Sequence, residues 1–181
     1  MSTFRTLDTA GDLTGQTALV RVDFNVPMEN GRVTDDTRLR AALATINRLR
    51  EAGARVALLA HFGRPKGQRV ADMSLEPVVA PLAALLGAPV AFARDCVGEA
   101  AQAAIASLDD GGVVLLENVR FHKGEEKNAP AFAAQWAALG DLYVNDAFSA
   151  APRAHGSTEG IARLLPAYAG ESMRRELEAL D

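Results

Sequence analysis

The sequence predicts an α/β fold with three layers, in which an open sheet of mainly parallel strands has helices on both faces. Short apolar runs alternate with stretches of helical periodicity, an order typical of right-handed strand–helix–strand crossovers. Several runs are apolar at consecutive positions, as in strands that are covered on both sides. No repeat, low-complexity tract or flexible linker divides the 181 residues. We therefore expect one domain built on one sheet.

Five runs rich in Val, Leu and Ala are the predicted strands. They cover residues 17–23, 55–61, 89–93, 113–118 and 142–146. The composition, 49% hydrophobic and 23% charged, is sufficient for one substantial core around such a sheet.

Two amphipathic stretches between these runs predict helices. Apolar residues recur at helical spacing over 39–49, and Gly53 follows as a stop signal. A second stripe covers 75–86 and has Ser74 before it as a candidate N-cap. Pro81 lies inside that stripe, and we expect it to kink the helix or to end it early.

The last segment, residues 170–181, also has helical spacing, because Met173, Leu177 and Leu180 fall on one face. Such a helix could cap this domain, or it could be the first part of a structure that continues beyond the sequence. The spacing leaves both interpretations open.

Charge and cysteine content exclude several classes of protein. A formal charge of −4 argues against general nucleic-acid binding, which requires a basic face, so any anion site must be local. Cys96 is the only cysteine and is predicted to be a structural thiol, not part of a disulfide or a thiolate cluster. The sequence has no apolar run of about 18 residues and no signal peptide, so we expect a soluble cytoplasmic protein.

Polar side chains follow four of the predicted strands at the point where each strand ends. In an open α/β sheet these carboxyl ends line the ligand crevice. The candidates are Asp23, Asn25, His61, Arg64, Arg120, His122, Asp146, Arg153 and His155. Arg38 begins the helix after the first strand and is a further candidate.

This residue set suits a small anion with several charges. Guanidinium groups bind phosphate or carboxylate through paired hydrogen bonds and stay charged when partly buried. Asp23 would repel such an anion unless it accepts a hydrogen bond from a hydroxyl group, which indicates a phosphorylated hydroxy acid. Gly63 would allow backbone amides to approach the ligand closely.

Each candidate also has a structural interpretation. A single Arg after a strand can be a surface charge, and His61 or His122 can be a packed, hydrogen-bonded side chain. The aromatic residues Phe24, Phe62 and Phe121 favour a place in the core over a stacking role.

Common nucleotide and metal motifs are absent from the sequence: it has no GxxxxGK[ST], no GxGxxG after the first strand and no HExxH. His122 with Glu125 and Glu126 could suggest a metal site, but the surrounding HKGEEKN is typical of an exposed loop. We place no metal here.

Taken together, these segments resemble phosphoglycerate kinase. The matching blocks, in family order, are RVDFNVP at 21–27, TRL at 37–39, HFGRPKG at 61–67, LLENVRFHKGEE at 115–126 and YVNDAFSAAPRAHGST at 143–158. They extend along essentially the whole chain but cover only about half of the family's length. The resemblance implies a Rossmann-like domain and favours truncation over a complete protein.

The resemblance also implies a function. The family transfers a phosphoryl group reversibly between 1,3-bisphosphoglycerate and ADP in glycolysis, giving 3-phosphoglycerate and ATP. Its N-terminal domain binds the acid, its C-terminal domain binds Mg-ATP or Mg-ADP, and hinge closure joins them. Residues 1–169 would be the acid-binding domain, and residues 170–181 would lead into an absent nucleotide-binding domain. This monomeric part would bind 3-phosphoglycerate but would hold no cofactor and show no turnover.

Ten positions are carried over from the family as substrate contacts. They are Asp23, Phe24, Asn25, Arg38, His61, Phe62, Gly63, Arg64, Arg120 and Arg153. The resemblance implies that Asp23 and Asn25 contact the glycerate end, and that His61 and the arginines other than Arg38 hold the 3-phosphate. Arg38 would reach the carboxyl or acyl phosphate and stabilise the transferred group.

Two positions depart from the family pattern. Phe62 replaces a Leu, which is a packing change, and Pro152 replaces a His beside Arg153 and removes a backbone donor. Two alternatives stay open: a non-catalytic sensor or scaffold domain for a phosphorylated acid, and an RNA-binding module. The net acidity and the 6% aromatic content argue against the RNA-binding module.

Overall fold

The computed structural model describes residues 5–147 and 155–180, and it confirms the α/β fold. Its main sheet is parallel throughout and has the strand order β5-β6-β4-β1-β7-β8. The strands are β1 (Thr17–Arg21), β4 (Arg55–Leu59), β5 (Val90–Ala93), β6 (Val113–Leu116), β7 (Leu142–Asn145) and β8 (Ala167–Ala169). A two-stranded hairpin, β2 (Met28–Glu29) and β3 (Arg32–Val33), lies outside this sheet.

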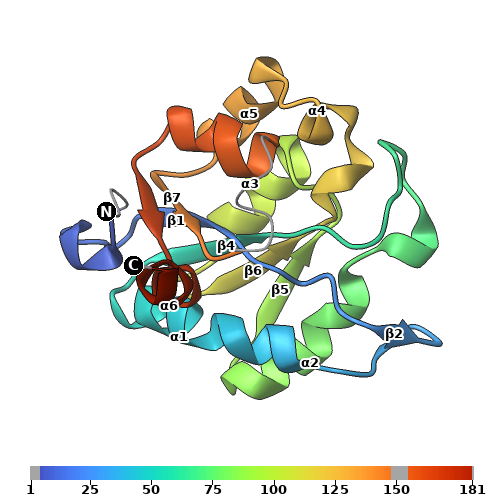
Figure 1. Cartoon of the computed structure of the whole chain (residues 1–181), viewed down its shortest axis with the longest axis horizontal. Coiled ribbons are helices and arrows are strands. Elements are labelled where there is room, and N and C mark those ends of the chain that lie inside the picture. The colour runs from blue at the N-terminus through green and yellow to red at the C-terminus, as the bar shows by residue number, and fades with distance from the viewer. Residues whose placement is uncertain (1–4, 148–154, 181) are drawn as a thin grey trace.

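Helices cover the sheet on two sides (Figure 1). They are α1 (Thr37–Glu51), α2 (Val79–Leu86), α3 (Gly98–Ala106), α4 (Lys123–Glu126), α5 (Pro130–Ala137) and α6 (Glu171–Leu180). Short 3-10 turns are η1 (Leu7–Thr9), η2 (Ala71–Met73), η3 (Glu76–Val78), η4 (Val119–Phe121) and η7 (Ile161–Arg163), and η6 (Gly156–Gly160) is a π turn. No helix of the described ranges is long and apolar enough to cross a membrane.

The core has two halves, one on each face of the sheet, because successive strand residues point in opposite directions. Ala18 and Val20 of β1 face the half that includes Ile46 of α1. Between them, Leu19 faces the other half, with Trp136 of α5. Both halves are closed to water, as the consecutive apolar residues of the strands predict.

The strands are shorter in the structure than predicted. β1, β4, β6 and β7 end one or two residues before their predicted ends, and β5 starts one residue after its predicted start. The ladder of β1 ends at Arg21 and that of β4 at Leu59, before Asp23 and His61. The polar residues therefore lie in the loops beyond the ladder, where their side chains are not confined to one face of the sheet. The elements without a predicted range are the short hairpin, the edge strand β8 and the helices α3, α4 and α5.

The helix predicted over 75–86 is wrong in its first half. Residues Glu76–Val78 form a 3-10 turn, and α2 begins only at Val79. Ser74 does not cap α2, since its hydroxyl donates to Glu117 Oε2 at 2.6 Å. Pro81 is the third residue of α2, where its missing N–H has no intrahelical acceptor, so it starts the helix late and does not end it early.

The C-terminal segment forms a helix that packs beside α1 (Figure 1). The backbone N–H of Glu171 donates to Thr45 Oγ1 on α1 at 2.7 Å. Arg48 of α1 pairs with Glu171 and, at 2.6 Å, with Asp8. Met173 is buried at 4% exposure. These contacts attach α6 to the same core as the sheet.

Candidate functional site

The ends of β1, β4 and β6 are tied together at Gly63. Its N–H donates to Asn25 Oδ1 at 3.0 Å, and its carbonyl oxygen accepts from Arg120 Nη1 at 3.4 Å. Gly63 has φ of +66°, and an added Cβ would lie 3.1 Å from Met73 Sδ. The left-handed backbone favours glycine here, and a Cβ would have to displace the Met73 side chain. Residues that follow three different strands therefore meet at one edge.

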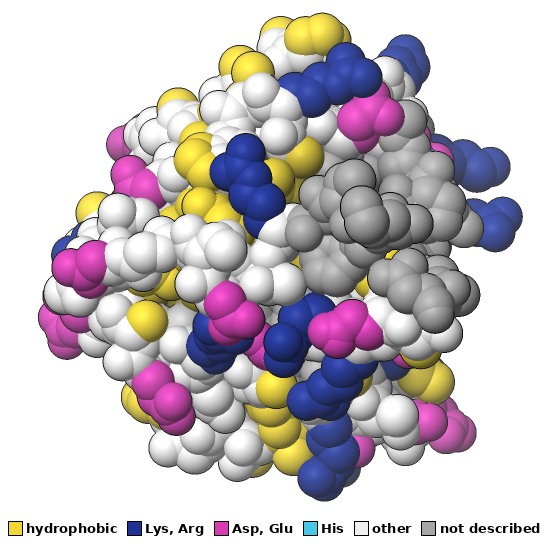
Figure 2. Space-filling view, turned by 60° about the vertical axis from the view of Figure 1, so that its left-hand side comes forward, with side chains coloured by type: hydrophobic (Ala, Val, Ile, Leu, Met, Phe, Trp, Pro, Cys, Tyr) yellow, Lys and Arg dark blue, Asp and Glu magenta, His cyan; other side chains and the backbone are white. Residues whose placement is uncertain are grey.

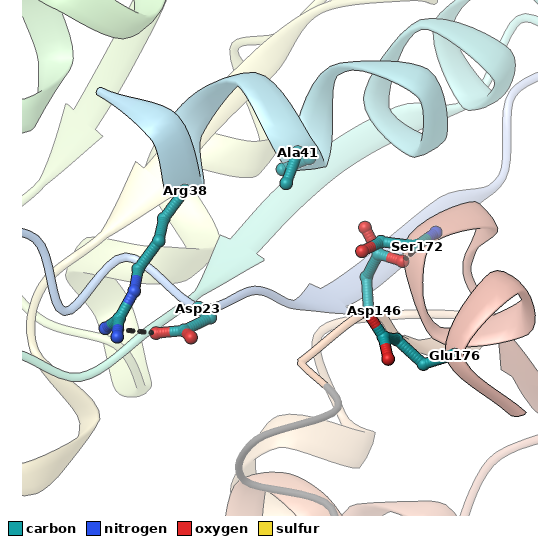
Figure 3. A pocket seen from close by; sticks show the side chains of 7 residues that line it. Asp23, Arg38, Ala41, Asp146, Ser172 and Glu176 are labelled. Atoms are coloured by element: carbon teal, nitrogen blue, oxygen red, sulfur yellow. Dashed lines mark hydrogen bonds and ion pairs between the residues drawn. The ribbon is translucent and has the colours of Figure 1, made fainter. Parts of the chain in front are cut away.

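Arg38 lies at the start of α1 and faces the residues that follow β1. Its Nη1 donates to the carbonyl oxygen of Asn25 at 2.6 Å and to Asp23 Oδ1 at 3.3 Å (Figure 3). The side chain of Arg38 is half exposed. A half-exposed guanidinium with a nearby carboxylate can exchange that partner for a ligand at modest cost.

Two hollows adjoin Arg38. One has a volume of about 240 Å³ and lies between α1 and the start of α6 (Figure 3). It is lined by Asp23, Arg38, Ala41, Ala42, Asp146, Ser172 and Glu176. The other, of about 530 Å³, is lined by Asn25, Val26, Pro27, Asp35, Thr37 and Arg38. Arg38 is the side chain common to both, whereas His61, Arg64 and Arg120 line neither of them.

His61 is packed against Arg21, in agreement with the structural interpretation of this histidine. His61 is 8% exposed, and its Nδ1 lies 2.7 Å from Arg21 Nη2. Arg21 is fully buried and also donates to Ser157 Oγ at 2.8 Å and to the carbonyl oxygen of Val22 at 2.6 Å. Arg21 was not among the predicted site residues, although a charged residue in the middle of the apolar run TALVRVD was a signal that buried partners exist.

Arg120 and Arg64 differ in exposure. Arg120 is 5% exposed and belongs to η4, whose first turn is capped by Asn118 Oδ1, the acceptor for the Arg120 N–H at 3.0 Å. Asn118 Nδ2 also donates to the carbonyl oxygen of Phe62 at 2.7 Å. Arg64 is exposed at the same edge. Arg153 and Pro152 lie outside the described residues.

The aromatic candidates belong to the core. Phe24 is fully buried, so its side chain faces away from the edge, and Phe62 is partly buried against the same half of the core. Both agree with the packing interpretation, and only the backbone at these two positions lies along the edge.

The segment HKGEEKN is not simply an exposed loop, as the sequence had suggested. It contains α4, and Glu125 is fully buried and accepts from the Ser157 N–H at 2.7 Å and from Ser157 Oγ at 2.5 Å. Glu126 is exposed. The ring of His122 does not join these two acids, because its Nε2 lies 2.6 Å from Asp95 Oδ1.

Charged side chains of both signs share one face of the molecule. Figure 2 shows several Lys and Arg side chains grouped in the lower middle of the displayed face, with Asp and Glu side chains among them. Several arginines of the described residues have carboxylate partners, such as Arg174 with Glu171 at 2.6 Å. This mixture fits a chain with a net charge of −4 and a local anion site.

Comparisons with known proteins point to one family. A family model described as phosphoglycerate kinase matches residues 7–181. The phosphoglycerate kinase of Caulobacter vibrioides (strain NA1000 / CB15N) is 70% identical over 179 residues, which are 99% of this chain and 45% of that protein. The phosphoglycerate kinase of Methylorubrum populi is 64% identical over 180 residues, again 99% of this chain and 45% of the relative.

Solved structures agree with these relatives. The phosphoglycerate kinase of Pyrococcus horikoshii OT3 has a TM-score of 0.88 at 34% identity, over 97% of this chain and 44% of that chain. The enzyme of the same name from Coxiella burnetii has a TM-score of 0.87 at 38% identity, over 98% and 44%. The present chain thus spans less than half the length of the proteins it matches.

Proposed function

This chain belongs to the phosphoglycerate kinase family, and we propose that it is the part of such an enzyme that binds the acid substrate. In this proposal residues 1–169 bind 3-phosphoglycerate or 1,3-bisphosphoglycerate, and residues 170–181 lead toward a nucleotide-binding domain. The complete protein would transfer the phosphoryl group reversibly between 1,3-bisphosphoglycerate and ADP. We expect a monomer of the cytoplasm that binds neither nucleic acid nor membranes.

One observation carries the proposal, the pair of hydrogen bonds at Gly63. They bring Asn25 and Arg120, from segments 95 positions apart, to a single loop, with exposed Arg64 as the next residue. An anion at this edge would meet guanidinium groups from two strand ends. Each charge-assisted bond contributes roughly 1.5–3 kcal/mol, so a few of them can hold an anion against water.

Arg38 and Asp23 suit the carboxylate and hydroxyl groups of the acid. Asp23 is an acceptor that would bind the hydroxyl group, and the Arg38 guanidinium would bind the carboxylate or acyl phosphate. Their present contact of 3.3 Å keeps both side chains at the edge before a ligand arrives. During phosphoryl transfer Arg38 would stabilise the charge on the moving group, the electrostatic task that this chemistry requires.

His61 is suited to contact the phosphate through one ring nitrogen. A guanidinium has only donors, so Nδ1 of His61 must accept the bond from Arg21. A neutral ring then carries its proton on Nε2, which is a donor and fits a phosphate oxygen. Arg21 would hold this tautomer, while Arg64, Arg120 and the undescribed Arg153 would supply the remaining positive charge.

We do not expect the nucleotide to bind the residues of the present chain. We propose that Mg-ATP or Mg-ADP binds the part of the enzyme beyond these residues, and that the 181-residue chain alone has no kinase activity. Conversion of 3-phosphoglycerate and ATP by this chain, above the background of a preparation of the Arg38→Ala variant, would contradict that part of the proposal.

Ligand-dependent unfolding tests the acid site directly. We would compare thermal unfolding with and without millimolar 3-phosphoglycerate, with inorganic phosphate and ATP as ligand controls. At about a hundred times its dissociation constant, the ligand should add roughly 2.7 kcal/mol to the free energy of unfolding. The Arg64→Ala variant should lose this gain, whereas Arg40→Ala, an exposed arginine paired with Asp36, should keep it. An equal gain from inorganic phosphate, or no gain, would overturn the proposed site.

A further inference from the structure

A second group of polar side chains lies at the ends of β5 and β6. Asp95 and Cys96 follow β5, and His122 follows η4 at the end of β6, the neighbouring parallel strand. One oxygen, one sulfur and one nitrogen of these residues lie within 4.8 Å of one another. None of the three residues belongs to the proposed acid site.

We propose that Asp95, Cys96 and His122 form a binding site for a divalent transition-metal ion of the Zn²⁺ class. The ligands would be Cys96 Sγ, His122 Nε2 and a carboxylate oxygen of Asp95, with water in the fourth position. Thiolate, imidazole and carboxylate are the ligands that Zn²⁺ takes in proteins, and a sulfur ligand disfavours Mg²⁺ and Ca²⁺.

The distances need small adjustments only. Metal–ligand bonds of about 2.0–2.3 Å place tetrahedral ligand atoms about 3.3–3.8 Å apart. The three atoms lie within 4.8 Å of one another, so any separation above this range must shorten, and the 2.6 Å between His122 Nε2 and Asp95 Oδ1 must open. Both of those side chains are about one third exposed, so they can move by this amount.

The three side chains differ in solvent exposure, which leaves the proposed site open to water on one side and closed on the other. Asp95 and His122 face solvent, while Cys96 is completely buried. An ion would pass between the carboxylate and the imidazole and reach the sulfur behind them. Water would then have access from one side only, which suits a site with a single open position.

Neighbouring groups orient the three ligands. The Cys96 N–H donates to Asp95 Oδ1 at 2.7 Å, and Trp136 Nε1 donates to the Cys96 carbonyl oxygen at 2.8 Å. The His122 ring packs on Phe132 with a centroid distance of 5.0 Å. Such outer contacts fix ligand orientation and raise metal affinity.

Two features of the proposed site oppose metal binding. Arg69 Nη2 lies 3.9 Å from Asp95 Oδ2, and burial together with the Asp95 charge raises the pKa of the Cys96 thiol well above its usual range. Metal binding must therefore form a metal–sulfur bond and release the thiol proton to solvent. The His122 proton that faces Asp95 must also leave Nε2, so that the neutral ring carries its proton on Nδ1 when Nε2 binds the ion. His122 also follows η4, which carries Arg120, so a bound ion would fix one side of the acid site.

Cobalt(II) gives a direct readout, because a thiolate ligand adds a sulfur-to-cobalt charge-transfer absorption in the near ultraviolet. We would titrate the reduced chain with Co²⁺ at neutral pH and then add Zn²⁺. We expect this absorption to saturate at one ion per chain, to disappear when Zn²⁺ displaces Co²⁺, and to accompany proton release.

Variants identify the ligands. Cys96→Ala should abolish the absorption, and His122→Gln or Asp95→Asn should weaken Co²⁺ affinity by more than about tenfold, the smallest loss expected even for an outer-shell partner. Glu126→Gln removes an exposed acid from the same segment and should bind as the unchanged chain does. If Cys96→Ala fails to fold, the two surface variants still decide. The proposal would be overturned if the folded chain showed no such absorption with Co²⁺. It would also be overturned if His122→Gln and Asp95→Asn both bound Co²⁺ as tightly as the unchanged chain.

Discussion

The Asp146→Asn substitution tests how the fold attaches its last helix. Asp146 is 5% exposed, and its Oδ1 accepts from the N–H groups of Ser172 at 2.9 Å and Met173 at 3.1 Å, at the start of α6. Burial raises the pKa of Asp146 from 3.8 to about 6, although these amide hydrogen bonds act in the opposite direction. The native fold therefore disfavours the charged form of this carboxyl.

The sign of the pH dependence follows from that shift. Between pH 3.8 and about 6 the folded chain binds a proton that the unfolded chain has released, so the free energy of unfolding falls as pH rises through this window. The contribution is complete below 3.8 and is lost above about 6. At about 1.4 kcal/mol per pKa unit, it amounts to roughly 3 kcal/mol at most.

Asparagine keeps an oxygen acceptor for both amides and removes the charge. Urea unfolding between pH 4 and 8 should show the variant more stable than the unchanged chain at pH 7, by up to about 3 kcal/mol, with the difference shrinking toward pH 4. Asp109→Asn, in an exposed loop, is the matched control, for which we expect no such pH-dependent difference. If the Asp146→Asn difference were the same at pH 4 and pH 8, the reasoning from burial would be refuted.

Three further substitutions test packing and buried hydrogen bonds, each measured by urea unfolding. Gly170→Ala places a Cβ 2.4 Å from Asp146 Oδ1 and should lower the free energy of unfolding by about 1–3 kcal/mol, through overpacking. Tyr143→Phe removes the hydroxyl that donates to the Ser157 carbonyl oxygen at 2.7 Å, and the unpaired carbonyl should cost about 1–3 kcal/mol. Glu125→Gln sets an amide donor against the Ser157 N–H or hydroxyl, and we expect a loss of similar size.

Each of these three predictions has a control or an outcome that would contradict it. Tyr168→Phe, at a partly buried position, is the control for Tyr143→Phe, and equal effects would show that the hydroxyl bond contributes nothing. Glu126→Gln serves the same purpose for Glu125→Gln. Unchanged stability of Gly170→Ala would mean that Asp146 can move aside.

Much of the fold could be predicted because strands and helices depend on local patterns. The consecutive apolar residues of the strands predicted burial on both sides, which the structure confirms. Element ends were less predictable, since a hydrogen-bonded ladder ends where its neighbour ends, as at Arg21 beside Leu59. The edge strand β8 is held by pairing with β7 and by a parallel bridge between Ala169 and Thr6, and three residues such as Ala167–Ala169 have no pattern to reveal it.

The candidate site could be predicted in part. The motifs indicated which strand ends carry polar residues, and the structure joins Asn25, Gly63 and Arg120 there. The ligand roles of these residues stay predictions. Burial of His61 against Arg21 was not predictable in detail, because their contact depends on the pairing of β1 with β4.

The sequence by itself determined five strands of the main sheet, the helices α1 and α6, the family and the residue types at the strand ends, because these depend on neighbours in the chain. Only the tertiary structure decided which distant side chains meet. His122 lies beside Asp95 and Cys96, not beside Glu125, because β5 and β6 are adjacent in the sheet. Glu125 is instead buried against Ser157, where α4 meets η6. The physical reason is that strand order and helix packing, which arise from the whole core, set these distances.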